Sequence, residues 1–106
     1  MLTCLRMRVY LGYPVRVTIW KFPLQLIDTQ QVMMPSATQI LTAQAQCEVL
    51  TIWGIVPDSE MNRADVVPIT IEIHGTGRTD RSPHGLSYIG TVQSHAGLFV
   101  WHIFRR

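Results

Sequence analysis

The residues best suited to chemistry lie in one glycine-containing stretch, Ile73-His-Gly-Thr-Gly77, and in the polar segment after it. Paired glycines after a strand let backbone N–H groups approach an anion. Arginines and a histidine follow closely enough to add charge-assisted hydrogen bonds. The segment therefore predicts a ligand site for a nucleotide or small anion, made of His74, Gly75, Thr76, Gly77, Arg78, Arg81 and His84. The alternative is a plain turn or bulge, because no helix pattern follows Gly77 to complete a phosphate site.

The sequence offers no catalytic or metal-binding constellation. No serine or cysteine stands in a nucleophile motif, so we predict a protein that is not an enzyme, with no catalytic residues and no cofactor. Glu72 and His74 share one face of a predicted strand and could pair as acid and base, but a solvated strand surface is the preferred interpretation. The four histidines are seven to eleven residues apart and lack the close pair typical of metal sites, so no metal is predicted.

Length and charge limit the remaining classes. The chain has 106 residues, 47% of them hydrophobic and 15% charged, and a net charge of +2, which fits one domain. Residues 1–21 carry four bases and no acid, whereas residues 22–106 carry five bases and seven acids. Because the basic residues are not clustered on the domain itself, nucleic-acid binding is not expected. No apolar run is long enough for a membrane span and no signal peptide is visible, so we expect a soluble cytoplasmic protein, with Cys4 and Cys47 as free thiols.

The elements that must position the candidate site are short strands. Period-two alternation and β-branched residues, bounded by proline and glycine, predict strands at residues 17–22, 29–34, 67–74, 88–93 and 98–104. Residues 39–56 are interpreted as a hairpin broken at Gln46-Cys-Glu48, with Leu41, Ala43 and Ala45 on one face; a single helix is the alternative. We predict a single compact all-β domain, an antiparallel β-sandwich or small barrel of six to seven strands, over residues 17–106, with residues 1–16 as an N-terminal extension.

The last predicted strand, Leu98 to Phe104, is apolar on both faces, so it must be covered twice. The cover could come from residues 1–16, the second sheet or another subunit. Exposed aromatic residues commonly mark interfaces. The predicted interface residues are Trp53, Phe99, Trp101 and Ile103, and the predicted partner is another protein or a second copy of the chain in a dimer.

Several sequence pieces also carry a family resemblance. They are Ile19-Trp-Lys-Phe-Pro-Leu24, Met34-Pro35, Ile40-Leu41 with Gln44, Ile73-His-Gly-Thr-Gly77, Tyr88-Ile-Gly-Thr91 with Gln93 and Gly97, and Val100-Trp-His-Ile-Phe104. Over residues 17–106 the chain resembles a family of small proteins of tailed phages and prophages that has no assigned activity. The resemblance implies a phage accessory protein that binds a host component, such as an inhibitor of a host defence system of the anti-CRISPR kind. A sponge that sequesters a nucleotide signal, or a small structural phage protein, is the alternative.

Overall fold

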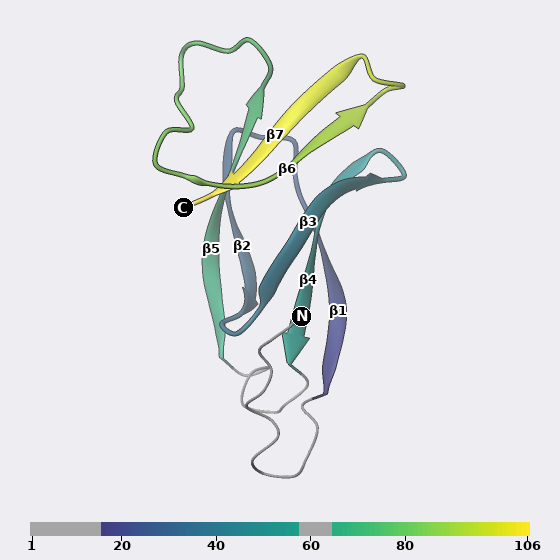
Figure 1. Ribbon diagram of the computed structural model, residues 1–106, viewed down its shortest axis with the longest axis vertical. Helices are drawn as coiled ribbons and strands as arrows, with labels where there is room; N and C mark the ends of the chain where they lie inside the picture. Colours follow the sequence, from purple (N-terminus) through teal and green to yellow (C-terminus); the bar gives the residue numbers. More distant parts are fainter. Residues whose placement is uncertain (1–15, 58–64) are drawn as a thin grey trace.

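Seven antiparallel strands in two sheets make up the described part of the chain (Figure 1). The computed structural model describes residues 16–57 and 65–106, and the predicted extension at residues 1–16 lies outside them except for Arg16. The strands are β1 (Val17–Pro23), β2 (Thr29–Pro35), β3 (Gln39–Gln46), β4 (Val49–Pro57), β5 (Val66–Gly75), β6 (Ser87–Ser94) and β7 (Phe99–Arg105). The predicted all-β sandwich is confirmed, and residues 39–56 form a hairpin rather than the alternative helix.

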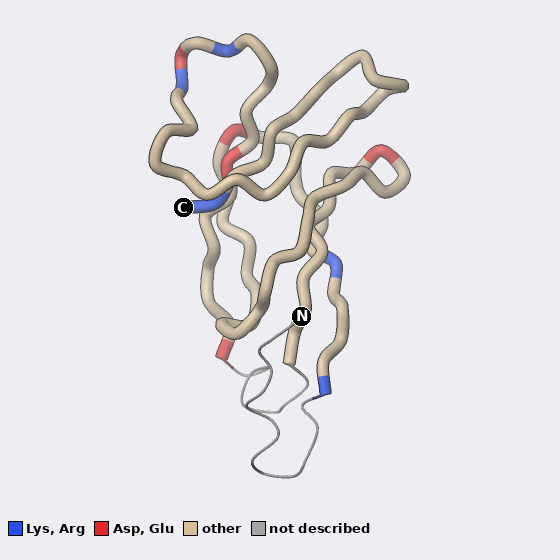
Figure 2. The backbone as a smooth tube through the Cα atoms, viewed as in Figure 1, with Lys and Arg blue, Asp and Glu red and all other residues tan. Residues whose placement is uncertain are grey.

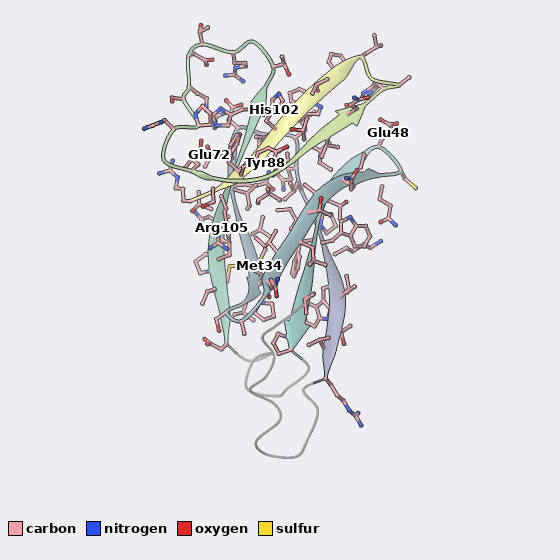
Figure 3. All side chains as sticks on the ribbon, viewed as in Figure 1. Met34, Glu48, Glu72, Tyr88, His102 and Arg105 are labelled. Atoms are coloured by element: carbon pink, nitrogen blue, oxygen red, sulfur yellow. The ribbon has the colours of Figure 1, made fainter. Side chains whose placement is uncertain are left out.

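The two sheets divide the strands without following sequence order. The three-stranded sheet has the order β1-β4-β3, and the four-stranded sheet has the order β2-β5-β7-β6. Alternate residues of each strand turn inward, and together they form one core. Its fully buried members include Met34, Ala43, Ile52, Val56, Ile71, Val92 and Ile103. Met34 lies between the two sheets in Figure 3. Within residues 16–57 and 65–106 the structure contains no helix that could span a membrane.

Strands β3 and β6 contact each other between the two sheets, and each has an irregularity in its pairing with its own sheet. The β3–β4 register shifts between Ile40 and Thr42, and the β6–β7 register shifts between Tyr88 and Gly90. The first bulge leaves Leu41 exposed, while Ile40 packs against the core. The predicted inward face of this strand was therefore wrong for Leu41, and it was also wrong for Ala45, which is exposed.

The second half of strand β7 is covered on both faces by its own chain, whereas Phe99 at its start is 48% exposed. It lies inside the four-stranded sheet, and Ile103 on its inner face is fully buried in the core. Its outer face carries His102 and Phe104, which pair with His74 and Glu72 of β5. Residues 76–86, here called the covering loop, connect β5 to β6 and lie over this outer face (Figure 1). The second sheet thus covers one face of β7 and the covering loop covers the other.

Candidate functional site

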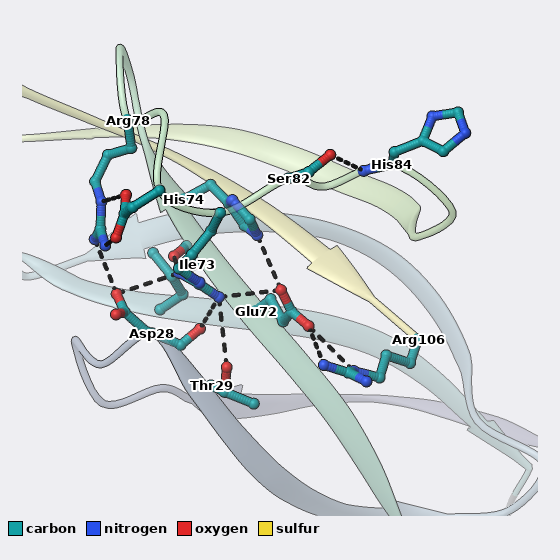
Figure 4. Close-up of polar contacts among 11 residues, drawn as sticks. Asp28, Thr29, Glu72, Ile73, His74, Arg78, Ser82, His84 and Arg106 are labelled. Atoms are coloured by element: carbon teal, nitrogen blue, oxygen red, sulfur yellow. Dashed lines mark hydrogen bonds and ion pairs between the residues drawn. The ribbon is translucent and has the colours of Figure 1, made fainter.

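A buried carboxylate organises the outer face of the four-stranded sheet. Glu72 is only 6% exposed, and its oxygens accept hydrogen bonds from three side chains (Figure 4). His74 Nε2 and Arg81 Nη2 each lie 3.0 Å from Oε1, and Arg106 donates to Oε2 at 3.1 Å and 2.6 Å. The expectation that Glu72 and His74 form a solvated strand surface was wrong, because the covering loop and the C-terminal Arg106 enclose them.

The environment of Glu72 keeps this carboxylate charged. Burial in itself raises the pKa of Glu72, because a buried charge loses its hydration. The hydrogen bonds from His74 and Arg106 and the positive charges of Arg106 and Arg81 outweigh that effect, and the pKa lies below its ordinary value. The carboxylate therefore acts as an anionic anchor for its three donors and is poorly suited to hold a proton for general acid catalysis.

Arg81 fastens the covering loop to the rest of the domain. Its guanidinium donates to the carbonyl oxygens of Ile73 at 2.8 Å and Asp28 at 2.9 Å, in addition to Glu72. It also lies 3.2 Å from the Asp28 carboxylate. The planar guanidinium carries five donors in a fixed fork, so one side chain joins the loop, β5 and the segment before β2.

Arg78 makes a second, more exposed anchor. Its guanidinium donates to both Asp80 oxygens, at 3.0 Å and 2.6 Å, and to Asp28 Oδ1 at 3.0 Å. The bidentate hydrogen bonds from Arg78 are the main reason that the pKa of Asp80 falls to about 2, and the same pairing raises the pKa of Arg78. Figure 2 shows the alternation of these basic and acidic residues along the covering loop.

The charges of this region balance, which bears directly on the predicted anion site. Three guanidiniums, of Arg78, Arg81 and Arg106, meet three carboxylates, of Asp28, Glu72 and Asp80. An incoming phosphate would have to displace Asp28 or Asp80 from its arginine partners. The structure thus brings the predicted arginines together, but with their charges already neutralised.

The predicted glycines form a turn beside a small cavity. Arg78 N–H donates to Gly75 O at 3.4 Å, and Gly77 has a φ of +85°, which a side chain at this position would strain. The adjoining cavity has a volume of about 180 Å³. It is lined by His74, Gly75, Thr76, Gly77, Arg78, Arg81, Pro83, His102 and Phe104. Six of the seven predicted ligand residues therefore line one pocket.

The seventh predicted ligand residue, His84, does not join them. It is exposed, its N–H donates to Ser82 Oγ at 3.2 Å, and its ring points away from the cluster in Figure 4. His102 takes its place as a lining residue because it is the cross-strand partner of His74. Sequence reasoning missed His102 as a site residue, although pairing the last strand with residues 67–74 in register would have found it.

A hydrogen-bonded chain runs through His102. The Thr76 hydroxyl lies 2.7 Å from His102 Nε2, and the Thr91 hydroxyl lies 3.0 Å from Nδ1. The Tyr88 hydroxyl is 2.6 Å from that of Thr91. Both ring nitrogens are thus engaged, and the imidazole is held in one orientation. Figure 3 places His102, Tyr88 and Glu72 at the end of the molecule that carries the covering loop.

A second, larger groove lies at the β6–β7 hairpin. Its volume is about 360 Å³, and it is lined by Gly75, Thr76, Arg78, Leu98, Phe99, Val100 and Trp101. Leu98 is 79% exposed and Phe99 is 48% exposed. The Phe99 and Trp101 rings stack with their centroids 6.0 Å apart, and Trp101 Nε1 donates to Ser94 Oγ at 3.1 Å. The groove, Leu98 and Phe99 together are called the hairpin surface below.

The turns beside the hairpin surface have left-handed backbone. His95, Ala96 and Gly97 have φ values of 53°, 57° and 87°, and the turn is closed by Gly97 N–H to Ser94 O and Leu98 N–H to His95 O. Cys47 and Glu48 of the β3–β4 turn are also left-handed. The Glu48 carboxylate accepts the His95 N–H at 2.8 Å, so the two turns support each other. Left-handed L-residues are strained, and such strain is concentrated at functional sites.

The predicted interface residues do not form one surface. Phe99 and Trp101 belong to the hairpin surface. Ile103 is fully buried in the core, so its assignment to an interface was wrong: it faces the second sheet. Trp53 is half-buried on the three-stranded sheet, where it pairs with Lys21 and Thr42. Cys47 is an exposed free thiol at the β3–β4 turn, and Cys4 lies outside the described residues.

Comparisons with known proteins identify a family but no activity. A family model described as a domain of unknown function (DUF7352) matches residues 16–106. No curated protein and no solved structure matches the chain. Inference about function therefore depends on the geometry of the pocket and of the hairpin surface.

Proposed function

The chain belongs to the DUF7352 family of domains of unknown function, and on that premise we propose that it is a non-enzymatic binding protein whose hairpin surface contacts another protein. The observation that carries the proposal is the exposure of Leu98 and Phe99 beside an apolar groove of about 360 Å³. Large apolar and aromatic side chains next to a groove are typical of the anchors in protein interfaces.

The strained turn supports the same proposal. His95 and Ala96 hold a conformation that costs L-residues free energy, and Glu48 of the other hairpin keeps it in place. This conformation presents Leu98 at the tip, where it makes little contact with its own chain. The turn thus places Leu98 at an exposed tip, as the proposal requires.

The catalytic alternative finds little support in the geometry. Among residues 16–57 and 65–106, the buried acid and histidine pair is Glu72 with His74, and both arginine donors of Glu72 favour its ionised form. The residues around it fasten the covering loop. This arrangement serves stability rather than catalysis, and the hairpin surface is the region that we propose for protein recognition.

The partner we propose is a host protein, and the role is that of a phage accessory factor that inhibits a host defence component. The support is the resemblance of residues 17–106 to small phage and prophage proteins, which commonly act by binding a host component. A second copy of the chain is the competing occupant of the hairpin surface, and the experiment below distinguishes the two.

Site-specific photo-crosslinking tests the proposal. A photoreactive phenylalanine analogue replaces Leu98 in one sample and Leu26, another exposed leucine, in a matched control. After irradiation in an extract of a susceptible host, we expect one defined protein to crosslink at Leu98 and not at Leu26. With that partner purified, the Leu98→Ser change should weaken binding by about five- to thirtyfold, which corresponds to about 1–2 kcal/mol, and Leu26→Ser should not.

Two outcomes would contradict the proposal. Crosslinking at Leu98 only to a second copy, with a concentration-dependent dimer in light scattering that Leu98→Ser abolishes, would assign the surface to self-association. Equal crosslinking at both positions would show that the hairpin surface has no special role.

A further inference from the structure

The 180 Å³ pocket beneath the covering loop is distinct in chemistry from the hairpin surface. Its floor is formed by His74, His102 and Phe104 of β5 and β7, and its rim by the covering loop. The edges of the His74 and Phe104 rings meet at a centroid distance of 5.5 Å. Two imidazoles and a phenyl ring thus lie together in one small cavity.

The balance of positive and negative side chains around the pocket disfavours anionic ligands. Arg78 and Arg81 line the pocket, but both are bound to carboxylates, and Asp28 and Asp80 would repel a phosphate. The pocket is also small, because sites for drug-sized ligands occupy about 300–1,000 Å³. A complete nucleotide held through its phosphates is therefore disfavoured, and an uncharged compound with a single ring system is favoured.

His74 and Thr76 determine which hydrogen bonds a ligand in the pocket can form. The ring of His74 is almost entirely buried, and its Nε2 donates to the charged Glu72. In a neutral imidazole with Nε2–H, the other nitrogen, Nδ1, is an acceptor. The Thr76 hydroxyl, fixed by His102 Nε2, can both donate and accept. In its neutral Nε2–H form, His74 thus has one acceptor nitrogen, and the Thr76 hydroxyl can donate or accept beside the Phe104 ring.

We propose that this pocket binds a small uncharged nitrogen heterocycle of the nucleobase class. A ring N–H of the ligand donates to His74 Nδ1, a second polar group of the ligand bonds to the Thr76 hydroxyl, and the ring packs against Phe104. The proposed contacts do not involve Leu98 or Phe99, although the pocket shares Gly75, Thr76 and Arg78 with the groove of the hairpin surface.

Amide-resolved NMR titration of the full chain tests the proposal. The probes are adenine, cytosine and uracil, with inorganic phosphate and adenosine monophosphate as charged counterparts. We expect at least one base to shift the amide signals of Gly75, Thr76 and Gly77 with a dissociation constant of about 1 mM or lower. Phosphate should leave these signals unchanged, and the monophosphate should bind no more tightly than its base.

Two variants locate the bound ligand. Thr76→Val removes the pocket hydroxyl at nearly constant shape and should weaken binding by about five- to tenfold. Thr91→Val removes the other hydroxyl partner of His102, which does not line the pocket, and should change the affinity by less than about twofold. The folded state of each variant is checked by its NMR spectrum.

Three results would overturn the proposal. The first is that no base shifts these amides up to its solubility limit. The second is that phosphate shifts them as strongly as a base, which would restore an anion site. The third is equal loss of affinity in the two valine variants, which would place the ligand outside this pocket.

Discussion

Two positions on the outer faces of the two sheets are buried to opposite extents, and residue type alone does not explain it. On the three-stranded sheet, Ile19 is 61% exposed, although it is a large apolar residue. On the four-stranded sheet, Glu72 and His74 are almost completely buried, although both are polar. No described segment lies over the first face, whereas the covering loop lies over the second. The burial of Glu72 and His74 is thus due to the covering loop and Arg106 and not to residue type.

The difference shows what a loop needs in order to cover a sheet. The covering loop is polar and cannot be held by hydrophobic burial alone. It is held by Arg81, whose donors reach β5 and the segment before β2, and by Arg78 through Asp28. Because buried polar groups are costly without partners, the anchors and the buried Glu72 depend on one another.

The largest expected effect on stability comes from removing the buried carboxylate of Glu72. Glu72→Ala leaves Arg81 and His74 without their buried acceptor, and we expect the free energy of unfolding to fall by about 2–3 kcal/mol. This loss is smaller than the roughly 3–5 kcal/mol typical of breaking a buried ion pair, because Arg106, one of the partners of Glu72, is 62% exposed and stays hydrated. Ile19→Thr on the other outer face should change stability by less than about 0.5 kcal/mol. Urea denaturation measures both.

The charge control for this experiment is Asp80→Asn. Asp80 also pairs with an arginine but is exposed, and it should matter far less than Glu72. If Glu72→Ala and Ile19→Thr destabilised the chain equally, the covering loop would not be anchored through Glu72.

A second test concerns the contact between β3 and β6, which holds the inner faces of the two sheets against each other. A Cβ atom at Gly90 of β6 would lie 3.3 Å from both the backbone nitrogen and the backbone oxygen of Ala43 in β3. Backbone cannot rotate away, so we expect Gly90→Ala to destabilise the protein by about 1–2 kcal/mol. The control is Gly75→Ala, whose Cβ would meet only side chains, of Trp101 and Arg78, at 3.4 Å or more. Equal thermal stability of the two variants would contradict a tight β3–β6 contact.

The sequence was sufficient to predict the strands, because alternation and turn residues are local signals. It was insufficient for the outer faces, because their burial depends on long-range contacts. Thr70, Glu72 and His74 do alternate with buried isoleucines, but whether a polar face is wet depends on where the covering loop folds. Leu41 was misplaced for a related reason: the bulge that turns it outward is visible only once β3 is paired with β4.

The candidate site shows the same limit. The glycines and arginines of the covering loop could be identified from their spacing, but Asp28, which neutralises both arginines, is fifty residues away from Arg78. His102 enters the pocket only because β7 pairs with β5. Long-range pairing thus changed the predicted chemistry of the site from anion binding to an almost neutral pocket.

A third test uses pH to discharge the buried carboxylate. The folded-state pKa of Glu72 lies below its ordinary value of 4.5, so its stabilising effect is fully present above that value. The effect is lost as the pH falls through the folded-state pKa. We expect the stability difference between the wild type and Glu72→Gln to be constant near neutral pH and to shrink below pH 4.5. A difference that stayed constant down to acid unfolding would contradict an ionised Glu72.

The smallest expected effect on stability comes from a glycine substitution in the β6–β7 turn, compared with one in strand β3. Ala96 has a φ of 57°, so Ala96→Gly should relieve left-handed strain. The gain is partly offset by the greater freedom of glycine in the unfolded chain, and we expect a net stabilisation of about 0.5 kcal/mol. Ala45→Gly, at an exposed position of β3, should instead destabilise by about 0.5–1 kcal/mol. Weaker binding of the crosslinked partner by Ala96→Gly, together with a higher melting temperature, would show that the left-handed turn helps to present the hairpin surface. If both Ala96→Gly and Ala45→Gly destabilised the protein, the turn would not be strained.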